Sequence, residues 1–310
     1  MRKSLIALAG ALALLIGPQS AGATPRLTVG PIHIAAAAGI APTAAPNNLM
    51  YWGGPTMHAT STTYAIFWEP PTLQSGALTA VSSTYNALIS RYFQDVGGSA
   101  LYNINTQYYD GTAHIANSST FGGSWVDTSA YPASTCNDTA TPGNCLNDAQ
   151  FQAEVAKAIQ TNGWTAGPDH VFFVYTSAGE GSCVGGTECA FTFYCAYHSH
   201  STLNGQTVIY ASQPYADSAP GCRVPSSPNN DIAADSTINV TSHEHMEAVT
   251  DPQLDAWYDL TQHENADKCA WDFGTPSLNG GTANVQWNTH YYLVQQEWNN
   301  TIGGCSLGGP

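Results

Sequence analysis

The segment His170–Thr176 constrains the fold most, because it is a short apolar run that can only be buried. It reads His-Val-Phe-Phe-Val-Tyr-Thr, and such β-branched and aromatic residues without alternation are typical of a strand covered on both faces. A strand of this kind needs a packed layer on each side of its sheet. A second strand is predicted at Thr62–Trp68, ended by Glu69-Pro70-Pro71.

Helical patterns alternate with these strands. Asn147 and Gln150 have the spacing of a capping box, and Gly163 lies just past the end of the helix that this box opens. A further helix is predicted at Ala233–Thr250, stopped by Asp251-Pro252. The remaining predictions are a helix from Leu78 to Phe93 closed by Gly97-Gly98, and strands at Leu101–Tyr109, Cys189–Tyr197 and Gln206–Ala211. The alternation predicts an α/β fold with a mixed, mostly parallel sheet covered by helices.

The chain begins with the pattern of a secretion signal. Arg2 and Lys3 precede the apolar run Leu5–Gly17, so residues 1–23 are predicted to be a signal peptide. Residues 24–48, rich in Ala, Pro, Thr and Gly, are predicted to form a linker or a short pro-segment. Residues 49–310 are long enough for a single large domain, and its part after Pro252 is irregular and aromatic-rich, as in a separate lobe.

Charge excludes two classes of partner. The formal net charge is −15 at pH 7, and removal of Arg2 and Lys3 would make the chain more acidic still. A surface of this sign is a poor partner for nucleic acid and for anionic membranes. No later segment is long and apolar enough to cross a bilayer, so we expect a secreted, extracellular protein that is not inserted in a membrane.

The eight cysteines favour disulfides in an exported chain. Cys136 and Cys145 bracket a short polar loop and could pair locally, and Cys269 and Cys305 could close the C-terminal lobe. The pairing of the other four cannot be chosen from the sequence, and they are Cys183, Cys189, Cys195 and Cys222. A zinc site that uses Cys189 and Cys195 is the lesser alternative.

The helix at Ala233–Thr250 carries the pattern of a metal site, His243-Glu244-His245-Met246-Glu247. Positions i and i+4 share one helix face, so His243 and Glu247 can hold the same ion. Glu244 would then lie where the water-activating base of a zinc hydrolase belongs. The pattern therefore predicts an α+β arrangement of the zincin type that binds Zn²⁺. Because the donor set is rich in carboxylates, Mn²⁺ and Ca²⁺ are alternatives.

A third protein ligand is needed. Glu264 is the first choice and Asp267 the alternate, since both follow the helix in a short acidic cluster. Tyr258 is a candidate donor to the oxyanion that forms from an amide carbonyl. Asp251 is expected to orient the imidazole of His243.

The other histidines near these motifs are more simply explained without a metal. His245 lies about 200° around the helix from His243, and it is expected to take no part in the site. His198 and His200 would face one side of a strand and could bind a metal, but a hydrogen-bonded surface pair is the favoured interpretation.

The chain resembles the phosphate-induced protein 1 family, whose plant members are called exordium proteins. The resemblance rests on segments in a fixed order, which are Met50–Pro55, Tyr64–Trp68, Ser242-His243-Glu244 with Glu247, Ala256-Trp257-Tyr258 and Glu264–Cys269. It implies an extracellular or cell-wall-associated protein. Plant relatives are linked to growth and nutrient signalling, whereas bacterial relatives with the same helix look like secreted metallopeptidases, and this chain resembles the bacterial type. Residue by residue, the resemblance points to His243, Glu244, Glu247, Glu264 and Asp267.

Two functions from different classes follow. The first is a secreted, metal-dependent hydrolase, a zinc metallopeptidase acting on a peptide or protein substrate, with Glu244 as general base. The second is a non-catalytic, exordium-like extracellular protein in which the same residues hold a structural ion or a network of hydrogen bonds. The alternative to both is that His243 and Glu247 lie on an ordinary polar helix face and have this spacing by chance.

Overall fold

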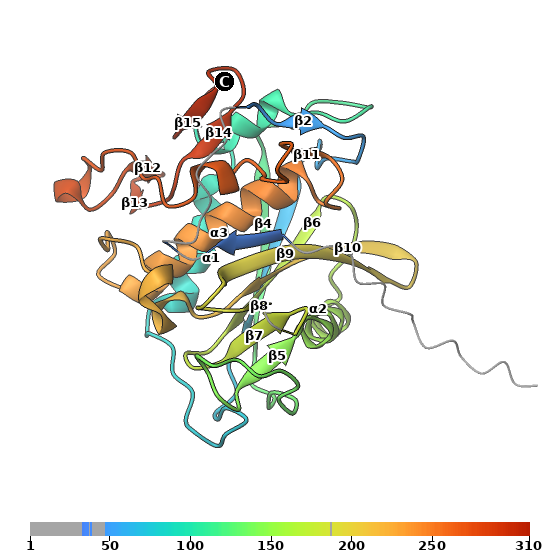
Figure 1. Ribbon diagram of the computed structural model, residues 1–310, viewed down its shortest axis with the longest axis vertical. Helices are drawn as coiled ribbons and strands as arrows, with labels where there is room; N and C mark the ends of the chain where they lie inside the picture. The colour runs from blue at the N-terminus through green and yellow to red at the C-terminus, as the bar shows by residue number, and fades with distance from the viewer. Residues whose placement is uncertain (1–32, 37, 39–46, 187) are drawn as a thin grey trace, which may run out of the picture.

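The computed structural model describes residues 33–36, 38, 47–186 and 188–310 (Figure 1). The predicted signal peptide, residues 1–23, lies outside the described residues. Of the predicted linker or pro-segment, residues 24–48, the structure describes 33–36, 38, 47 and 48. Within the described part of the chain, no helix is long and apolar enough to cross a membrane.

A six-stranded sheet forms the centre of the molecule, in the order β1-β9-β10-β6-β3-β4. The pairs β4–β3, β3–β6 and β6–β10 are parallel, while β9 runs antiparallel to β10 and β1 antiparallel to β9. The prediction of a mixed, mostly parallel sheet is therefore confirmed. Its strands are β1 (His33–Ala36), β3 (Ser61–Trp68), β4 (Ser119–Asp127), β6 (His170–Thr176), β9 (Tyr194–Leu203) and β10 (Gln206–Gln213).

Three helices cover this sheet on two faces (Figure 1), namely α1 (Tyr85–Val96), α2 (Asp148–Asn162) and α3 (Ile232–Thr250). Successive side chains of β3 point to opposite faces of the sheet, and this divides the core into two parts. Ala65 and Phe67 pack in the core that contains α1 and α3, whereas Tyr64, Ile66 and Trp68 pack in the core that contains α2. The two-sided burial predicted from the apolar run at β6 is thus observed.

Local signals place the helix ends. The capping box of Asn147 and Gln150 is present, and Gly163 closes α2 in the left-handed conformation at φ 66°. Helix α3 begins after Asp231, whose carboxylate accepts a hydrogen bond from the amide of Ala234. The predicted helix from Leu78 starts only at Tyr85. The preceding Ser82 and Thr84 hydroxyls donate to Asp231 instead, and this holds the segment outside the helix.

The predicted strand Leu101–Tyr109 is wrong. Residues Tyr102–Gln107 form a 3-10 helix, η1, in which the Ser99 hydroxyl accepts a bond from the amide of Tyr102. Leu101, Ile104 and Tyr108 are buried, and their spacing of three to four residues is helical rather than alternating. Strand β4 was not predicted; four of its nine residues are exposed, and it contains Gly122 and Gly123.

The residues after α3 form an irregular lobe of short elements, as the sequence predicts (Figure 1). They comprise β11 (Trp257–Tyr258), η4 (Asp267–Cys269), η5 (Asn279–Gly281), β12 (Val285–Trp287), β13 (His290–Tyr292), β14 (Glu297–Asn299) and β15 (Gly304–Ser306). Elsewhere lie β2 (Met50–Tyr51), β5 (Cys145–Asn147), β7 (Gly181–Val184), β8 (Glu188–Cys189), η2 (Ala216–Ser218) and η3 (Pro220–Cys222).

Four disulfides connect these elements. The predicted pairs Cys136–Cys145 and Cys269–Cys305 are both present. The four cysteines left open by the sequence pair as Cys183–Cys189 and Cys195–Cys222. Cys189 and Cys195 are therefore not available as zinc ligands.

Candidate metal centre

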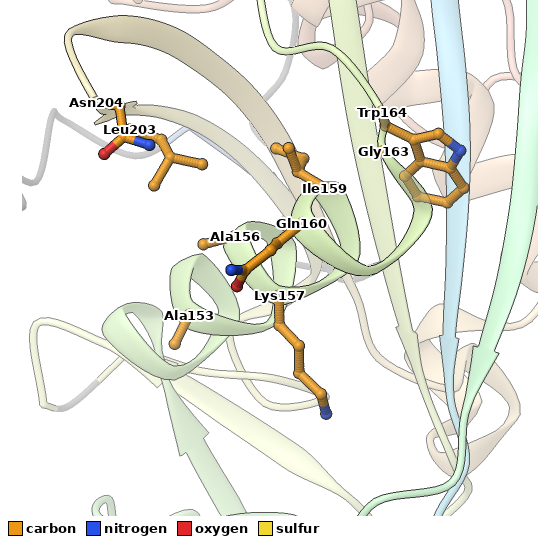
Figure 2. Close-up of a pocket in the computed structure, with 9 residues that line it drawn as sticks. All are labelled: Ala153, Ala156, Lys157, Ile159, Gln160, Gly163, Trp164, Leu203 and Asn204. Atoms are coloured by element: carbon orange, nitrogen blue, oxygen red, sulfur yellow. The ribbon is translucent and has the colours of Figure 1, made fainter.

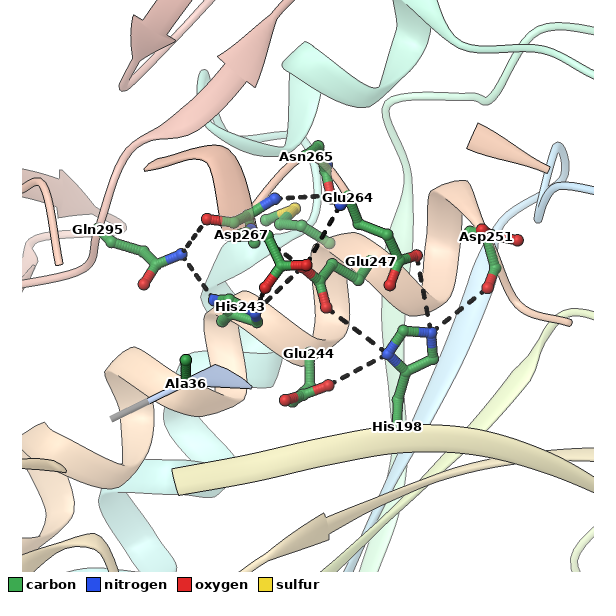
Figure 3. A network of polar contacts seen from close by, with 12 residues as sticks. Ala36, His198, His243, Glu244, Glu247, Asp251, Glu264, Asn265, Asp267 and Gln295 are labelled. Carbon is green, nitrogen blue, oxygen red and sulfur yellow. Dashed lines mark hydrogen bonds and ion pairs between the residues drawn. The ribbon is translucent and has the colours of Figure 1, made fainter. Parts of the chain in front are cut away.

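The motif residues of α3 lie on a face of the helix that the rest of the protein covers (Figure 3). His243, Glu244 and Glu247 are each at most 1% exposed. Nε2 of His243 is 3.0 Å from Oε1 of Glu247, one turn further along the helix. The imidazole and the carboxylate predicted to hold one ion therefore face each other directly.

The acidic cluster after the helix returns to this face. Oδ1 of Asp267 is 3.6 Å from Nε2 of His243, and the amide of Asp267 donates to Oε1 of Glu247 at 3.0 Å. Glu264 is fully buried beside them, and its own amide donates to Oδ2 of Asp267. Both candidates for the third ligand are thus brought to the helix.

Two contacts fix the loop that carries these acids. Lys268 forms a buried ion pair with Asp259 at 3.0 Å, and the Cys269–Cys305 disulfide ties the end of the loop to β15. Burial alone would raise the pKa of Asp259, but hydrogen bonds from Thr261, the His263 amide and Lys268 lower it to about 2. Asp259 therefore stays ionised at neutral pH, where it pairs with Lys268.

His198 on β9 completes the cluster, and the sequence had indicated it only as the less favoured metal-binding alternative. Its Nδ1 is 3.1 Å from Oε2 of Glu244 and 3.7 Å from Oε2 of Glu247, while its Nε2 is 3.9 Å from Oε1 of Glu264. The expectation of a surface histidine pair is wrong for His198, which is 0% exposed. The apolar residues Tyr194–Tyr197 just before it were the available signal, since they indicate a strand that is already buried at this point.

Among the described residues, four carboxylates and two imidazoles thus lie together in one buried centre. The carboxylates belong to Glu244, Glu247, Glu264 and Asp267, and the imidazoles to His198 and His243. Burial, followed by the neighbouring Glu247 and Asp251, raises the pKa of Glu264 well above its ordinary value. Burial would lower the pKa of His243, but the nearby carboxylates, led by Glu247, raise it instead. Acidic groups therefore outnumber basic ones among the described residues of the centre, and their crowding favours protonation of a carboxylate or binding of a cation.

A further buried acid, Glu297 on β14, adds to this excess. It is 0% exposed, and neither of its carboxylate oxygens has a hydrogen-bond donor among the described residues. Burial raises its pKa well above the ordinary value; the nearby His243 opposes this rise, while Glu247 adds to it.

Gln295 orients His243. Nε2 of its side chain lies 2.8 Å from Nδ1 of His243 and donates to the carbonyl oxygen of Ala266 at 3.0 Å. The backbone N–H of Gln295 donates to Oδ1 of Asn239. Nε2 of His243 therefore faces Glu247 and Asp267. The expectation that Asp251 orients His243 is wrong. The Asp251 carboxylate accepts bonds from the amides of Asp255 and Ala256, and its carbonyl oxygen lies 3.3 Å from Nε2 of His198.

Two other predicted positions lie away from the cluster. His245 points to the opposite side, where the Tyr92 hydroxyl and the Phe93 ring contact it; burial lowers its pKa to about 3. It is the bystander that the helix geometry predicts. Tyr258, the predicted oxyanion donor, lies on β11 with its ring stacked on Trp52. Among the described residues, its hydroxyl makes no hydrogen bond to the cluster.

The distances fit a metal ion. Ligands about 2.1 Å from a tetrahedral zinc are about 3.4 Å apart, close to the 3.0 and 3.6 Å that separate Nε2 of His243 from Glu247 and Asp267. Two compact ligand groups are present, His243 with Glu244 and Glu247, and His198 with Glu247 and Glu264. Glu247 belongs to both, so it is the central ligand candidate.

The centre is closed in this structure. All of its residues are at most 7% exposed, and a surface depression with a volume of about 640 Å³ lies elsewhere (Figure 2). Its walls come from α2, Trp164 and the end of β9 at Leu203. Lys157, the charged residue in its wall, is already paired with Glu154 and Asp127. This depression therefore offers no comparable chemistry.

Comparisons with known proteins give one partial relative. The protein Exordium-like 3 of Arabidopsis thaliana is 34% identical over 106 residues, which is 29% of this chain and 31% of the relative. The chain thus spans about a third of the length of the curated relative that it matches. No family model matches the chain, and no solved structure matches it. The partial match supports the resemblance to exordium-like proteins.

Proposed function

We propose that this chain is an exported, exordium-like protein whose α3 centre binds a divalent cation in a closed, non-catalytic site. One observation carries the proposal, namely that among the described residues four carboxylates and two imidazoles meet in a centre whose members are at most 7% exposed. The four disulfides support export, and the partial likeness to Exordium-like 3 supports the exordium-like character.

The argument for a cation is electrostatic. An unpaired buried carboxylate costs several kcal/mol after relaxation, so four of them beside two imidazoles must take up protons or an ion. A cation near Oε1 of Glu247 would face Nε2 of His243 and Oδ1 of Asp267 at once. It would also lie beside Oε2 of Glu247, which faces Nδ1 of His198 at 3.7 Å.

Zn²⁺ is the first choice of ion, because imidazole donors favour it over Ca²⁺. The ligands that we assign are His243, Glu247 and one acid from the loop, Glu264 or Asp267, with His198 as an additional donor. Because oxygen donors predominate, Mn²⁺ and Ca²⁺ are the alternatives to test.

A zinc metallopeptidase of the zincin type is the second candidate, and the position of Glu244 favours it. Glu244 follows His243 directly, and its Oε2 lies 3.1 Å from Nδ1 of His198. A proton can be shared between these two atoms. A bound ion would supply Lewis acidity toward an amide carbonyl and its attacking water. Glu244 would accept the proton, and Tyr258 would have to move to donate a hydrogen bond. The closed centre favours the first proposal over this one.

The deciding experiment is metal analysis of the purified protein, with thermal unfolding measured before and after chelation. We expect one equivalent of a divalent ion and a lower melting temperature after its removal. Glu247→Gln should lose the ion, whereas Glu180→Gln, which changes a fully buried acid outside the centre, should keep it. Absence of any ion, with no response to chelator or added metal, would contradict both metal proposals.

Glu244→Gln separates the two candidates. In the non-catalytic protein this variant keeps its ion and its fold, and neither it nor the natural chain cleaves peptide libraries. Hydrolysis by the natural chain that stops in Glu244→Gln, with the ion retained, would favour the peptidase.

A further inference from the structure

Strand β1 closes the candidate metal centre from outside. It pairs with β9 in antiparallel register, with His33 opposite His198 and Ala35 opposite Ala196. On its other side, the indole nitrogen of Trp271 donates to the carbonyl oxygen of Ala36 at 2.9 Å. Helix α3 lies against it as well, and Figure 3 shows Ala36 beside this helix. The strand therefore spans the space between β9 and the loop that carries Asp267.

Several of the contacts that hold β1 are contacts to its main chain. They include the ladder with β9 and the Trp271 bond to the Ala36 carbonyl, and two residues past the strand the amide of Ala38 bonds to the carbonyl of Gly221. Recognition through the main chain is the mode by which a sheet edge accepts an extended peptide of varied sequence.

Strand β9 can pair with an added strand on the side where β1 lies. It is ten residues long, and β1 covers only its part from Tyr194 to His198. On its other side, β10 pairs with Tyr197–Leu203, so the pairings with β1 and β10 overlap only at Tyr197 and His198. Without β1, the backbone groups of β9 on this side would be an unpaired edge directly beside the imidazole of His198.

We propose that β9 is a binding edge for an extended peptide, and that β1 is the chain's own occupant of that edge. Once β1 is displaced, a peptide of another molecule pairs with β9 antiparallel, as β1 does, and passes over the α3 centre between His198 and Trp271. The proposal rests on strand pairing and does not require an ion in the centre. It gives β1, which lies within the predicted linker or short pro-segment, a role as an internal cover.

The test uses the full chain with Ile34→Pro and Ala35→Pro together. Backbone N–H groups alternate in direction along a strand, so one of these two consecutive groups faces β9, and proline removes it. Ala44→Pro with Ala45→Pro is the matched control outside β1. The probe is a synthetic peptide with the sequence of residues 30–40, and the control peptide carries proline in place of Ile34 and Ala35.

Two measurements are made on each protein, with and without chelator. By hydrogen exchange, we expect alternate amides between Tyr194 and His198 to exchange at least tenfold faster in the β1 variant, while those that bond to β10 stay slow. By calorimetry, we expect the probe peptide to bind the β1 variant at least tenfold more tightly than it binds the natural chain or the matched control. The proline-containing peptide should bind none of them.

Trp271→Phe provides a second variant in which the sequence of β1 is natural. It removes the indole N–H that bonds to Ala36, so we expect probe affinity between that of the natural chain and that of the β1 variant. Unchanged exchange of β9 in the proline variant would overturn the proposal, because β1 would then not cover it. Exposed β9 amides without peptide binding, including aggregation of the variant through β9, would also overturn it. Because the metal analysis is independent, failure of the cation proposal remains distinguishable from failure of this one.

Discussion

The Cys269–Cys305 disulfide is expected to matter for both stability and cation binding, whereas Cys183–Cys189 should matter for stability alone. The first bond closes 36 residues of chain and the second closes 6. In the chain-entropy model, these loops correspond to about 4 and about 2 kcal/mol of stability. For a domain of this size, one kcal/mol shifts the melting temperature by about 2–4 °C. Replacing the pairs by serine should therefore lower it by about 8–16 °C and about 4–8 °C.

Cation affinity separates the two variants more sharply. Cys269 ends the loop that carries Glu264 and Asp267, and its bond to Cys305 fixes that loop against β15. Loss of such support typically weakens a metal site by about 10- to 100-fold. Cys183 and Cys189 lie in the small sheet of β5, β7 and β8, among residues packed near α2, so their removal should leave affinity unchanged.

The assay is isothermal calorimetry with Zn²⁺ at a temperature well below both melting points, so that each variant is folded. Unchanged affinity in Cys269→Ser/Cys305→Ser would refute the view that this disulfide positions the acidic loop. An equal loss in both variants would show that the loss comes from general destabilisation instead.

Three more outcomes are expected. Burial raises the pKa of Glu180 to about 8, from 4.5 in the unfolded chain, so its contribution to stability is complete below pH 4.5 and is lost as the pH rises through 8. Glu180→Gln should therefore be more stable than the natural chain at pH 9, by on the order of 2–4 kcal/mol, with the difference vanishing near pH 4 in denaturant titrations; a gap that does not vary with pH would contradict this. Gln295→Leu removes the group that orients His243 and should weaken cation binding about tenfold or more, measured by competition with a chromophoric chelator, and unaltered binding would mean that packing alone orients the imidazole. Asn147→Ala should cost about 1 kcal/mol by loss of the capping box without changing cation affinity, and a change in affinity would show that α2 is coupled to the centre.

The sequence predicted those parts of the fold that local chemistry determines. Helix α2 carries its own cap and its own terminating glycine, and β6 is apolar throughout, so both were placed closely. The segment at η1 was misplaced because Leu101, Ile104 and Tyr108 satisfy a short helix as well as a strand, and the Ser99 hydroxyl decides between them. A capping hydroxyl of this kind competes with strand pairing in a way that apolar spacing does not reveal.

The candidate site was predictable in the same uneven way. His243 and Glu247 are one helical turn apart, so their proximity follows from the helix alone. Glu264 and Asp267 could be named because they are the next acids along the chain. His198 could be named only as a less favoured alternative, since its position beside Glu244 depends on how β9 packs against α3. The pairing of β1 with β9 was equally hidden, because alanine-rich sequence favours no strand.

The composition of the centre has a consequence for the order in which the protein assembles. His198, the α3 residues and the acidic loop lie on three segments that meet only after β9 has joined the sheet and the C-terminal lobe has docked. Bringing such distant segments together is slow compared with forming a helix. A partly folded chain therefore has no complete set of ligands, and uptake of the ion would mark the last stage of maturation. Time-resolved metal uptake during refolding would thus report when the native structure is complete.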